Sequence, residues 1–394
     1  MDLTIYPGKL SGEIQAIPSK SQAHRLLICA AFSDKETILE CPQINADIEA
    51  TARCLNALGA DILRTSSGYR VMPAVKFPET ATIDCGESGS TLRFLLPIVC
   101  ALGIHATIQM HGRLPYRPLS PLWEELERMG AFLTRPTETT IQTSGKLRCG
   151  NYVISGNVSS QYISGLLFAT ALLDGDSTIK ITDTLESKPY IDMTQLALKT
   201  FGVSTENFQI SGSYPFCSPG RLTVEGDWSN AAFFLAAKVL GNPVEVKNLN
   251  ANSPQGDRAV VDILPGFEHL QTISAADIPD LVPILAATFG AKGGAVFTDI
   301  ARLRLKESDR VSSVCNMLNR LGAEASATED TLTVIPGRYH SCTIDSANDH
   351  RIAMAAAIAA TVADGPITIL GAECVAKSYP SFWEEYKELG GRYE

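Results

Sequence analysis

Six short polar segments along the chain each lead directly into an apolar stretch with helical spacing. Each segment mixes Ser, Thr, Asn or Gly with Lys, Arg or Gln. Residues of this kind cap a helix start, where unpaired backbone N–H groups and the positive end of the helix dipole also bind anions. The pattern predicts helices in the segments 18–32, 87–98, 159–170, 187–198, 306–318 and 348–360.

A second pattern repeats over a longer distance. Helical segments end in an apolar residue followed by glycine at Gly59, Gly130, Gly202, Gly322 and Gly390, and a weaker copy stands at Gly266. Glycine at this place is the usual left-handed helix stop. Short β-branched runs bounded by Gly, Pro and Asp lie between the helices and predict strands. The spacing indicates about six copies of a unit of roughly 65 residues, each with two helices and several strands.

Six units divide naturally into two similar domains of three, which also fits the length of 394 residues. The most turn-rich stretch between the halves is Ser211–Leu222, and we interpret it as one crossing between the domains. The first strand, near residues 3–9, could belong to either half.

The net charge of the chain argues against some classes of function. The chain has 33 Lys and Arg against 43 Asp and Glu, a net charge of −10, which argues against general nucleic-acid or membrane-surface binding. In such an acidic chain, the cations beside helix starts are informative because the helix dipole favours acids there. They predict a protein that collects several anionic groups in one cleft.

The remaining composition predicts no metal, disulfide or membrane segment. Ten cysteines form no C-x-x-C pair and are expected to be packed, reduced thiols in a cytoplasmic chain, and six histidines form no ligand-spaced cluster. The longest apolar run, 94–104, is too short to span a bilayer and predicts a buried helix. The N-terminal segment has no signal-peptide pattern.

Several candidate residues have ordinary alternatives on pattern alone. Asp280 precedes an apolar helix and could be an N-cap. Lys306 and Arg310 would face one side of a helix beginning near Arg302, one turn apart, where both could meet one anion. Arg117 could be a solvated surface side chain, with Arg113 as its competitor.

Ten strings, in order along the chain, carry a resemblance to a known family: SKSQAHR, SGSTLR, YRPL, SSQ, SKPYIDMT, VEGDWSNAAFFLAA, IPDLVPILA, LRLKESDR, NDHRIAMA and AKSYPSFWEEY. Together they resemble the enolpyruvyl transferase family, in its shikimate-pathway branch. The resemblance implies an α/β (α+β) fold of two domains, each with three βαβαββ units around buried helices. It also implies that the chain crosses twice, giving an N-terminal domain of residues 16–221 and a C-terminal domain of residues 1–15 and 222–394.

The implied reaction transfers the enolpyruvyl group of phosphoenolpyruvate to the 5-hydroxyl of shikimate 3-phosphate and releases inorganic phosphate, on the route to chorismate and aromatic amino acids. Preorganised charge and proximity can supply most of this chemistry without a cofactor. The resemblance implies Asp280 as the base, Glu307 as the proton donor and Lys20 as a third catalytic residue.

Two binding sets follow from the resemblance, the shikimate 3-phosphate side lying in the N-terminal domain and the base and acid in the C-terminal one. The shikimate 3-phosphate set is Lys20, Ser21, Arg25, Ser159, Ser160, Gln161, Ser187, Tyr190, Asp280 and Lys306. The phosphoenolpyruvate set is Lys20, Gly89, Arg117, Gln161, Arg310, Arg351 and Lys377.

The chain departs from the family pattern at two positions. Glu87 and Arg302 stand where relatives often carry asparagine, so Glu87 is expected to form a hydrogen-bonding wall or a cation partner, and no ligand contact is assigned to either. Gly89 leaves room beside phosphoenolpyruvate, which predicts sensitivity to glyphosate-type analogues.

Eight cations, Arg93 among them, divide four and four between the halves. This division predicts a site between the domains that closes on its ligands. Two alternatives remain open: a sister enzyme acting on UDP-N-acetylglucosamine, which the SSQ and SKPY strings fit less well, and a non-catalytic anion-binding protein. A monomer is expected.

Overall fold

All six predicted helices are present in the computed structural model, which describes residues 1–212 and 214–394. They are α1 (Lys20–Ala31), α3 (Gly89–Leu102), α5 (Ser160–Ala171), α6 (Lys188–Thr200), α10 (Arg310–Leu321) and α11 (His350–Ala360). Five of them start as capping chemistry requires, because a side-chain oxygen of Ser19, Ser88, Ser159, Asp309 or Asp349 accepts a backbone N–H of the first turn. The helix of the 306–318 segment begins only at Arg310, so the expected start near Arg302 was wrong.

The chain forms two compact units, joined where it crosses at residues 17–18 and 224–225. Unit 2 is Pro18–Val224, and unit 1 combines Met1–Ile17 with Glu225–Glu394. The expected boundaries were 15–16 and 221–222. The second differs because residues 221–223 form a strand that pairs within unit 2. Ser213, inside the predicted crossing Ser211–Leu222, lies outside the described residues.

In the described part of unit 2 the strands form three sheets. Their orders are β13 (Arg221–Thr223), β3 (Thr37–Glu40), β5 (Gly68–Met72), β4 (Asp61–Thr65); β6 (Thr80–Asp84), β7 (His105–Gln109), β9 (Thr140–Gly145), β8 (Ala131–Thr137); and β10 (Asn151–Ser155), β11 (Asp176–Thr182), β12 (Gln209–Ser211). The further helices are α2 (Ala46–Ala57) and α4 (Leu122–Arg128), with the 3-10 turns η1 (Leu114–Tyr116) and η2 (Glu206–Phe208).

Unit 1 repeats this plan with three sheets of its own. Their orders are β19 (Cys342–Asp345), β20 (Ile367–Leu370), β1 (Leu3–Tyr6), β21 (Arg392–Tyr393); β14 (Val244–Lys247), β2 (Gly12–Gln15); and β15 (Gln271–Ser274), β16 (Ala295–Thr298), β18 (Thr331–Ile335), β17 (Glu324–Ala327). The further helices are α7 (Trp228–Val239), α8 (Val260–Ile263), α9 (Val282–Ala291) and α12 (Phe382–Glu388), with the turns η3 (Gly256–Ala259), η4 (Leu264–Gly266), η5 (Ala301–Leu305) and η6 (Ala372–Lys377).

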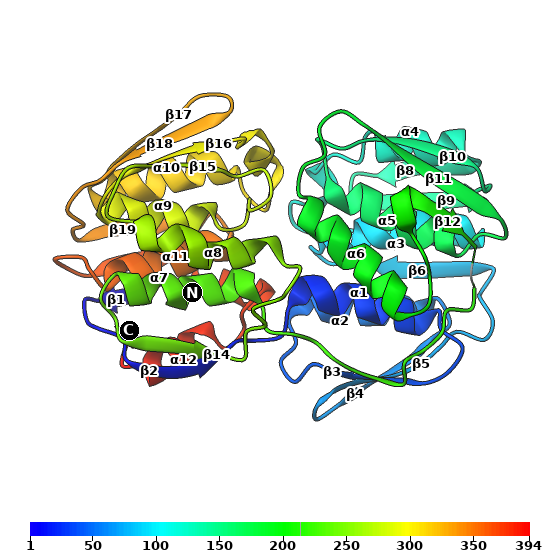
Figure 1. Ribbon diagram of the computed structural model, residues 1–394, viewed down its shortest axis with the longest axis horizontal. Coiled ribbons are helices and arrows are strands. Elements are labelled where there is room, and N and C mark those ends of the chain that lie inside the picture. Colours follow the sequence, from blue (N-terminus) through cyan, green and yellow to red (C-terminus); the bar gives the residue numbers. More distant parts are fainter. Residues whose placement is uncertain (213) are drawn as a thin grey trace. The chain divides into compact units, whose positions relative to one another are not determined.

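Each sheet contains one parallel pair of strands, and in four sheets that pair flanks a buried helix. These crossovers are β6-α3-β7, β10-α5-β11, β15-α9-β16 and β19-α11-β20 (Figure 1). In the other two sheets the parallel partners lie far apart in the sequence. Strands β2 and β14 of unit 1 flank the whole of unit 2, and β3 and β13 lie near the two ends of unit 2. The two crossings of the chain therefore explain the two exceptions to the repeat.

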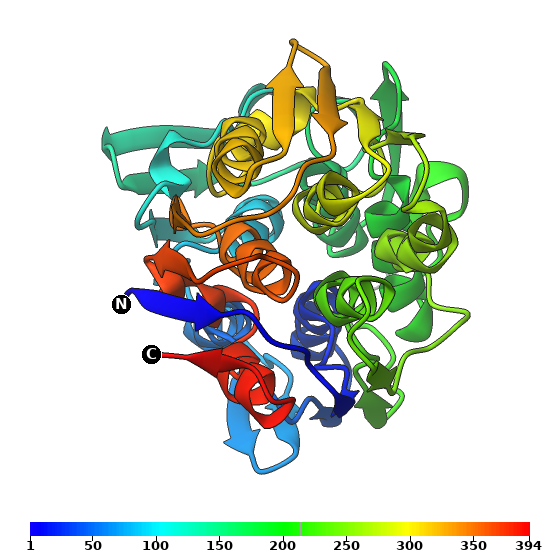
Figure 2. The ribbon, with the colours of Figure 1, turned by 90° about the vertical axis from the view of Figure 1, so that its left-hand side faces the viewer.

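The core of each unit lies around its central helices. Along α3 and α11 almost every residue is buried, because these helices are apolar on all sides and the sheets cover them. In unit 1 the helices are seen nearly end-on, with the β17–β18 hairpin and the strands β1 and β21 outside them (Figure 2). The buried helix predicted over 94–104 is α3. The fold is thus a mixed α/β architecture of two similar units, each with three sheets around buried helices.

Two smaller expectations concern glycines and cysteines. The five glycines of the helix-stop pattern all have positive φ, from +81° at Gly202 to +115° at Gly130, whereas the weaker copy at Gly266 lies inside η4. All ten cysteines are free thiols and six are buried, but Cys149 and Cys217 are exposed, so the expectation of packed thiols was wrong for these two. None of the helices in the described part of the chain combines the length and apolar composition that crossing a membrane requires.

Candidate functional site

A cluster of charges in unit 1 is centred on Asp280, in the loop before α9. Its Oδ1 accepts a hydrogen bond from Arg310 Nη1 at 2.8 Å, and its Oδ2 accepts one from Arg351 Nη2 at 3.1 Å. Lys306 Nζ lies 3.7 Å from Oδ1. The side chain does not cap α9, whose N-cap is Leu281. The ordinary N-cap alternative for Asp280 is therefore wrong, and this carboxylate is an ion-pair partner.

Arg310 ties the cluster together from a fully buried position. Besides Asp280, it donates from Nη2 to Glu307 Oε2 at 2.7 Å and from Nε to Asp349 Oδ2 at 3.0 Å. Asp349 is also fully buried, and its Oδ1 caps α11 by accepting the Arg351 N–H at 3.0 Å. One guanidinium thus holds three carboxylates, and it fixes the start of α10 against the start of α11.

These contacts set the protonation of the cluster. Burial alone would raise the pKa of Asp280, but Arg351, Lys306 and Arg310 together hold it well below its usual range. Burial lowers the pKa of Lys306 to about 8, although Asp280 opposes the shift. Burial likewise works against the charge of Arg310, but Asp349, Glu307 and Asp280 raise its pKa. Asp280 is therefore an ionised carboxylate among cations at neutral pH.

Lys306 and Arg310 meet at Asp280 by a route that differs from the expected one. The segment between them is not helical, since η5 ends at Leu305 and α10 begins at Arg310. The extended backbone at Lys306, with ψ at −160°, sends its side chain toward Asp280. The two cations converge on one carboxylate, but the prediction that they lie one helical turn apart was wrong.

The other candidate residues of unit 1 lie in different environments. Lys377 ends η6 and donates from Nζ to the backbone oxygen of Asn348, just before α11, at 3.2 Å. Arg302, in η5, donates to the backbone oxygen of Ala276 at 2.8 Å. Asp277, the neighbour weighed against Asp280, is exposed.

In unit 2 the first two turns of α1 carry three predicted residues, Lys20, Ser21 and Arg25. Lys20 Nζ lies 3.1 Å from Asp47 Oδ2, at the start of α2. Arg25 is buried and donates from Nη1 to the backbone oxygen of Ser21 at 2.6 Å, from Nη2 to that of Tyr190 at 2.8 Å, and from Nε to Thr194 Oγ1 at 2.7 Å. Arg25 thus joins α1 to the start of α6.

Another predicted group meets at the start of α3. A Cβ on Gly89 would lie 2.6 Å from Arg93 Nη1 and 2.7 Å from Arg117 Nη1, so both guanidiniums stand directly beside this glycine. Arg93 also donates to Gln161 Oε1 at 3.0 Å, and Gln161 Nε2 donates to Ser90 Oγ at 2.9 Å. This arrangement favours Arg117 over its exposed competitor, Arg113.

The remaining residues of unit 2 lie at two helix starts. Ser159 caps α5 by accepting the Gln161 N–H at 3.3 Å, and Ser160 is buried beside it. Ser187, also buried, precedes α6 in the left-handed conformation, with φ at +53°, and does not cap the helix. The side chain of Lys188 forms an exposed pair with Asp192, as expected of an ordinary surface cation.

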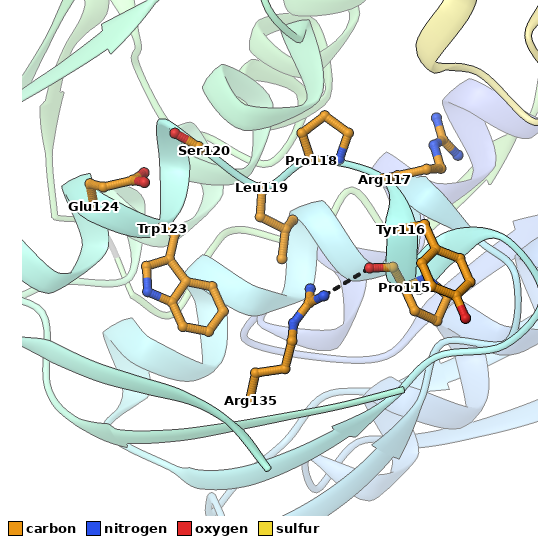
Figure 3. Close-up of a pocket in the computed structure, with 9 residues that line it drawn as sticks. All are labelled: Pro115, Tyr116, Arg117, Pro118, Leu119, Ser120, Trp123, Glu124 and Arg135. Carbon is orange, nitrogen blue, oxygen red and sulfur yellow. Dashed lines mark hydrogen bonds between the residues drawn. The ribbon is translucent and has the colours of Figure 1, made fainter. Parts of the chain in front are cut away.

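Glu87 and a surface pocket complete this region. The Glu87 carboxylate packs against the backbone of Gly112, where a Cβ would lie 2.6 Å from Oε2. The pocket is lined by Pro115, Tyr116, Arg117, Pro118, Leu119, Ser120, Trp123, Glu124 and Arg135. Figure 3 shows Arg117 pointing away from Trp123 and Arg135.

Sequence reasoning missed several residues of these clusters. Asp349 could have been found from the capping pattern in NDHR, whereas Asp47 and Thr194 show no local signal. Within the described residues, no group of three His, Cys, Asp or Glu side chains could hold a metal ion.

Comparison with known proteins gives consistent matches. The family model for EPSP synthase (3-phosphoshikimate 1-carboxyvinyltransferase) matches residues 5–277 and 265–386. The 3-phosphoshikimate 1-carboxyvinyltransferase of Clostridium acetobutylicum is 40% identical, with 98% of this chain and 97% of that one covered. The enzyme of the same description from Clostridium novyi is 38% identical, with 99% and 98% covered.

Solved structures agree. EPSP synthase from Acinetobacter baumannii has a TM-score of 0.81 and 25% identity, with 100% of this chain and 99% of that one covered. The enolpyruvyl transferase NikO from Streptomyces tendae has a TM-score of 0.72 and 16% identity, covering 100% and 98%, which shows the shared fold.

Proposed function

The chain belongs to the EPSP synthase (3-phosphoshikimate 1-carboxyvinyltransferase) family, and we propose that Asp280, Glu307 and Lys20 are the catalytic residues of its reaction. In that reaction the enolpyruvyl group of phosphoenolpyruvate passes to the 5-hydroxyl of shikimate 3-phosphate, and inorganic phosphate leaves. The observation that carries the assignment is the convergence of Lys306, Arg310 and Arg351 on Asp280.

Asp280 acts as the base through an exchange of partners. Its three cationic partners are the ones proposed to bind the phosphates and carboxylates of the substrates. When the substrate anions take up these cations, Asp280 loses the charges that depress its pKa and becomes more basic. The base is thereby activated only when both substrates are present.

Glu307 supplies the proton that the methylene carbon of phosphoenolpyruvate needs. As Asp280 removes the proton of the 5-hydroxyl, the oxygen attacks C2 and Glu307 protonates C3, giving a tetrahedral intermediate. Glu307 then takes a proton back from the new methyl group as the C–O bond to phosphate breaks. Asp280 passes its proton to the departing phosphate, so both carboxyl groups return to their starting states, and atoms and charges balance without a cofactor or a metal.

The two substrates are divided between binding sets in both units. We assign shikimate 3-phosphate to Lys20, Ser21, Arg25, Ser159, Ser160, Gln161, Ser187, Tyr190, Asp280 and Lys306. We assign phosphoenolpyruvate to Lys20, Gly89, Arg117, Gln161, Arg310, Arg351 and Lys377. Because each set draws on both units, the proposal requires the units to close on the bound pair. A decrease in the radius of gyration when both substrates are added tests this closure.

The finer assignments are part of the same proposal. The enzyme acts as a monomer in the cytoplasm, without nucleic-acid or membrane partners. Sedimentation of the purified chain at several concentrations tests the monomer, and a concentration-dependent dimer would refute it.

The decisive experiment is phosphate release from phosphoenolpyruvate and shikimate 3-phosphate in chelator-treated buffer. We expect turnover by the wild type and losses on the order of 10²–10⁴-fold for Asp280→Ala and for Glu307→Ala. Asp277→Ala, at the exposed neighbouring carboxylate, is the matched control and keeps its activity. Phosphate release from phosphoenolpyruvate with UDP-N-acetylglucosamine, but not with shikimate 3-phosphate, would identify the sister enzyme. Binding of both ligands without phosphate release would identify a non-catalytic protein.

A further inference from the structure

A buried chain of side-chain hydrogen bonds runs from α1 through α2 to the start of α3. His24 Nδ1 lies 2.7 Å from Thr51 Oγ1, Thr51 Oγ1 lies 2.7 Å from Thr91 Oγ1, and Thr91 Oγ1 donates to Ser88 Oγ at 2.7 Å. All four side chains are buried. Nothing in the proposed chemistry uses this chain, although it ends one residue before Gly89.

The imidazole of His24 is neutral and has one favoured tautomer. Burial, with smaller effects from Lys20 and Arg25, holds the pKa of His24 well below its usual range. In the described part of the protein, Nε2 has no hydrogen-bond partner. Leaving a buried N–H unsatisfied is costly, so the proton belongs on Nδ1, where Thr51 Oγ1 accepts it.

This tautomer gives the chain a direction. Thr51 accepts from His24 and donates its own proton to Thr91, which in turn donates to Ser88. Ser88 Oγ also accepts the backbone N–H of Thr91 at 3.2 Å as the N-cap of α3. The capping oxygen is therefore fixed from two sides, and the first turn of α3 is held in one position.

This row of hydrogen bonds connects the elements that carry the charged residues of the proposed site. His24 lies on α1 between Lys20 and Arg25, and Thr51 lies one turn after Asp47, the partner of Lys20. Ser88 precedes Gly89, beside which Arg93 and Arg117 stand. A positively charged imidazolium at this position would repel Lys20 and Arg25.

We propose that His24, donating from Nδ1 into the Thr51–Thr91–Ser88 chain, is a positioning residue that aligns the α1 cations with the phosphoenolpyruvate-binding start of α3. The inference rests on the function proposed above. It assigns no contact with substrate to His24.

Steady-state kinetics of Thr51→Val and Thr51→Ser test the alignment. Valine removes the hydroxyl while keeping the shape, and we expect the KM for phosphoenolpyruvate to rise about tenfold with little change in kcat, the effect of one buried donor losing its acceptor. Serine keeps the hydroxyl and restores the KM. Thr170→Val, which removes a buried hydroxyl bound to its own helix at the far end of α5, is the matched control. An unchanged KM in Thr51→Val would overturn the inference.

Nuclear magnetic resonance of the wild type, with ¹⁵N in its histidine rings, tests the tautomer directly. We expect one ring, absent from the spectrum of His24→Asn, to show the Nδ1–H pattern without titrating between pH 5 and 8. An Nε2–H pattern, or protonation near the ordinary pKa, would contradict the inference. If the wild type does not turn over the two substrates, the proposed function fails, but the spectrum still decides whether the directed chain exists.

Discussion

Replacing Arg310 by lysine isolates what a planar guanidinium contributes to the charge cluster of unit 1. Arg310 is fully buried and donates in three directions, to Asp280, Glu307 and Asp349, at 2.7–3.0 Å. A lysine keeps the charge, but its single nitrogen cannot reach three carboxylates at these distances. Arg310→Lys therefore leaves two carboxylates with a poorer partner.

The magnitude follows from the hydrogen bonds that lysine cannot make. A hydrogen bond to a charged group contributes about 1.5–3 kcal/mol, so the absence of two such bonds would cost about 3–6 kcal/mol. Asp349 is fully buried, but the side chains of Asp280 and Glu307 are 21% and 29% exposed, so solvent recovers part of this cost. We expect roughly 3 kcal/mol, which for a unit of this size lowers Tm by roughly 6–12 °C.

The loss of stability in Arg310→Lys should decrease as the pH falls. Burial raises the pKa values of Asp280 and Asp349, but the neighbouring cations, Arg310 among them, depress both below their ordinary value. A carboxyl with a depressed pKa contributes stability that is complete above its unfolded pKa, about 3.9, and is lost as the pH falls through the folded value. The difference between wild type and Arg310→Lys should therefore be full above pH 5 and shrink below pH 4.

Differential scanning calorimetry at pH 7 and at stepped acid pH measures both effects. Arg338→Lys is the matched control, because Arg338 is 86% exposed and pairs with Asp364 at the surface, where such pairs contribute about 0–1 kcal/mol. If Arg310→Lys melts within a degree or two of Arg338→Lys, or if its deficit is constant down to pH 3, the guanidinium does not hold the cluster together.

Three further predictions concern single groups. Burial and the charge of Asp280 raise the pKa of Asp257 to about 7, so its ionisation opposes folding as the pH rises from 4 to 7; Asp257→Asn should raise Tm at pH 8 but not at pH 4, and an equal shift at both would count against this. Gly89→Ala should raise the KM for phosphoenolpyruvate about tenfold or more, since its Cβ displaces the guanidiniums of Arg93 and Arg117, and kinetics matching the wild type would disprove the crowding. With a thiol reagent, exposed Cys149 and Cys217 should react first and buried thiols only on unfolding; fast reaction of Cys29 or Cys100, whose pKa values burial raises, would be inconsistent.

Helices and repeats were predictable because they depend on local signals. Polar caps before apolar stretches located six helices, and glycine after the last apolar residue located five helix ends. The cap at Ser187 failed because its left-handed backbone turns the hydroxyl away from the first turn, which serine as a residue type does not reveal. The boundary near 222 failed because β13 pairs with β3, a partner more than 180 residues earlier.

The candidate residues could be nominated from the sequence, but their partners could not. Asp280 looks like a helix cap in its own segment, and only contacts with residues 30 and 71 positions away reveal an ion-paired carboxylate. Lys306 was expected within a helix, but it lies in the non-helical segment between η5 and α10. The spacing of charges does not reveal where α10 begins. The ion pair of Asp349 with Arg310 and the hydrogen bond of His24 with Thr51 depend on burial, which long-range packing decides.

The insertion of one unit within the other also sets an order for the nascent protein. Unit 2 is continuous, so every residue it needs has been synthesised once Val224 has left the ribosome. In unit 1, Ile5 pairs with Ile367 and with Tyr393, so this sheet must wait for nearly the whole polypeptide. Translation thus delivers a finished inner unit first. Strand β2 obtains its partner β14 soon afterwards, whereas β1 remains without its partners β20 and β21 until nearly the end.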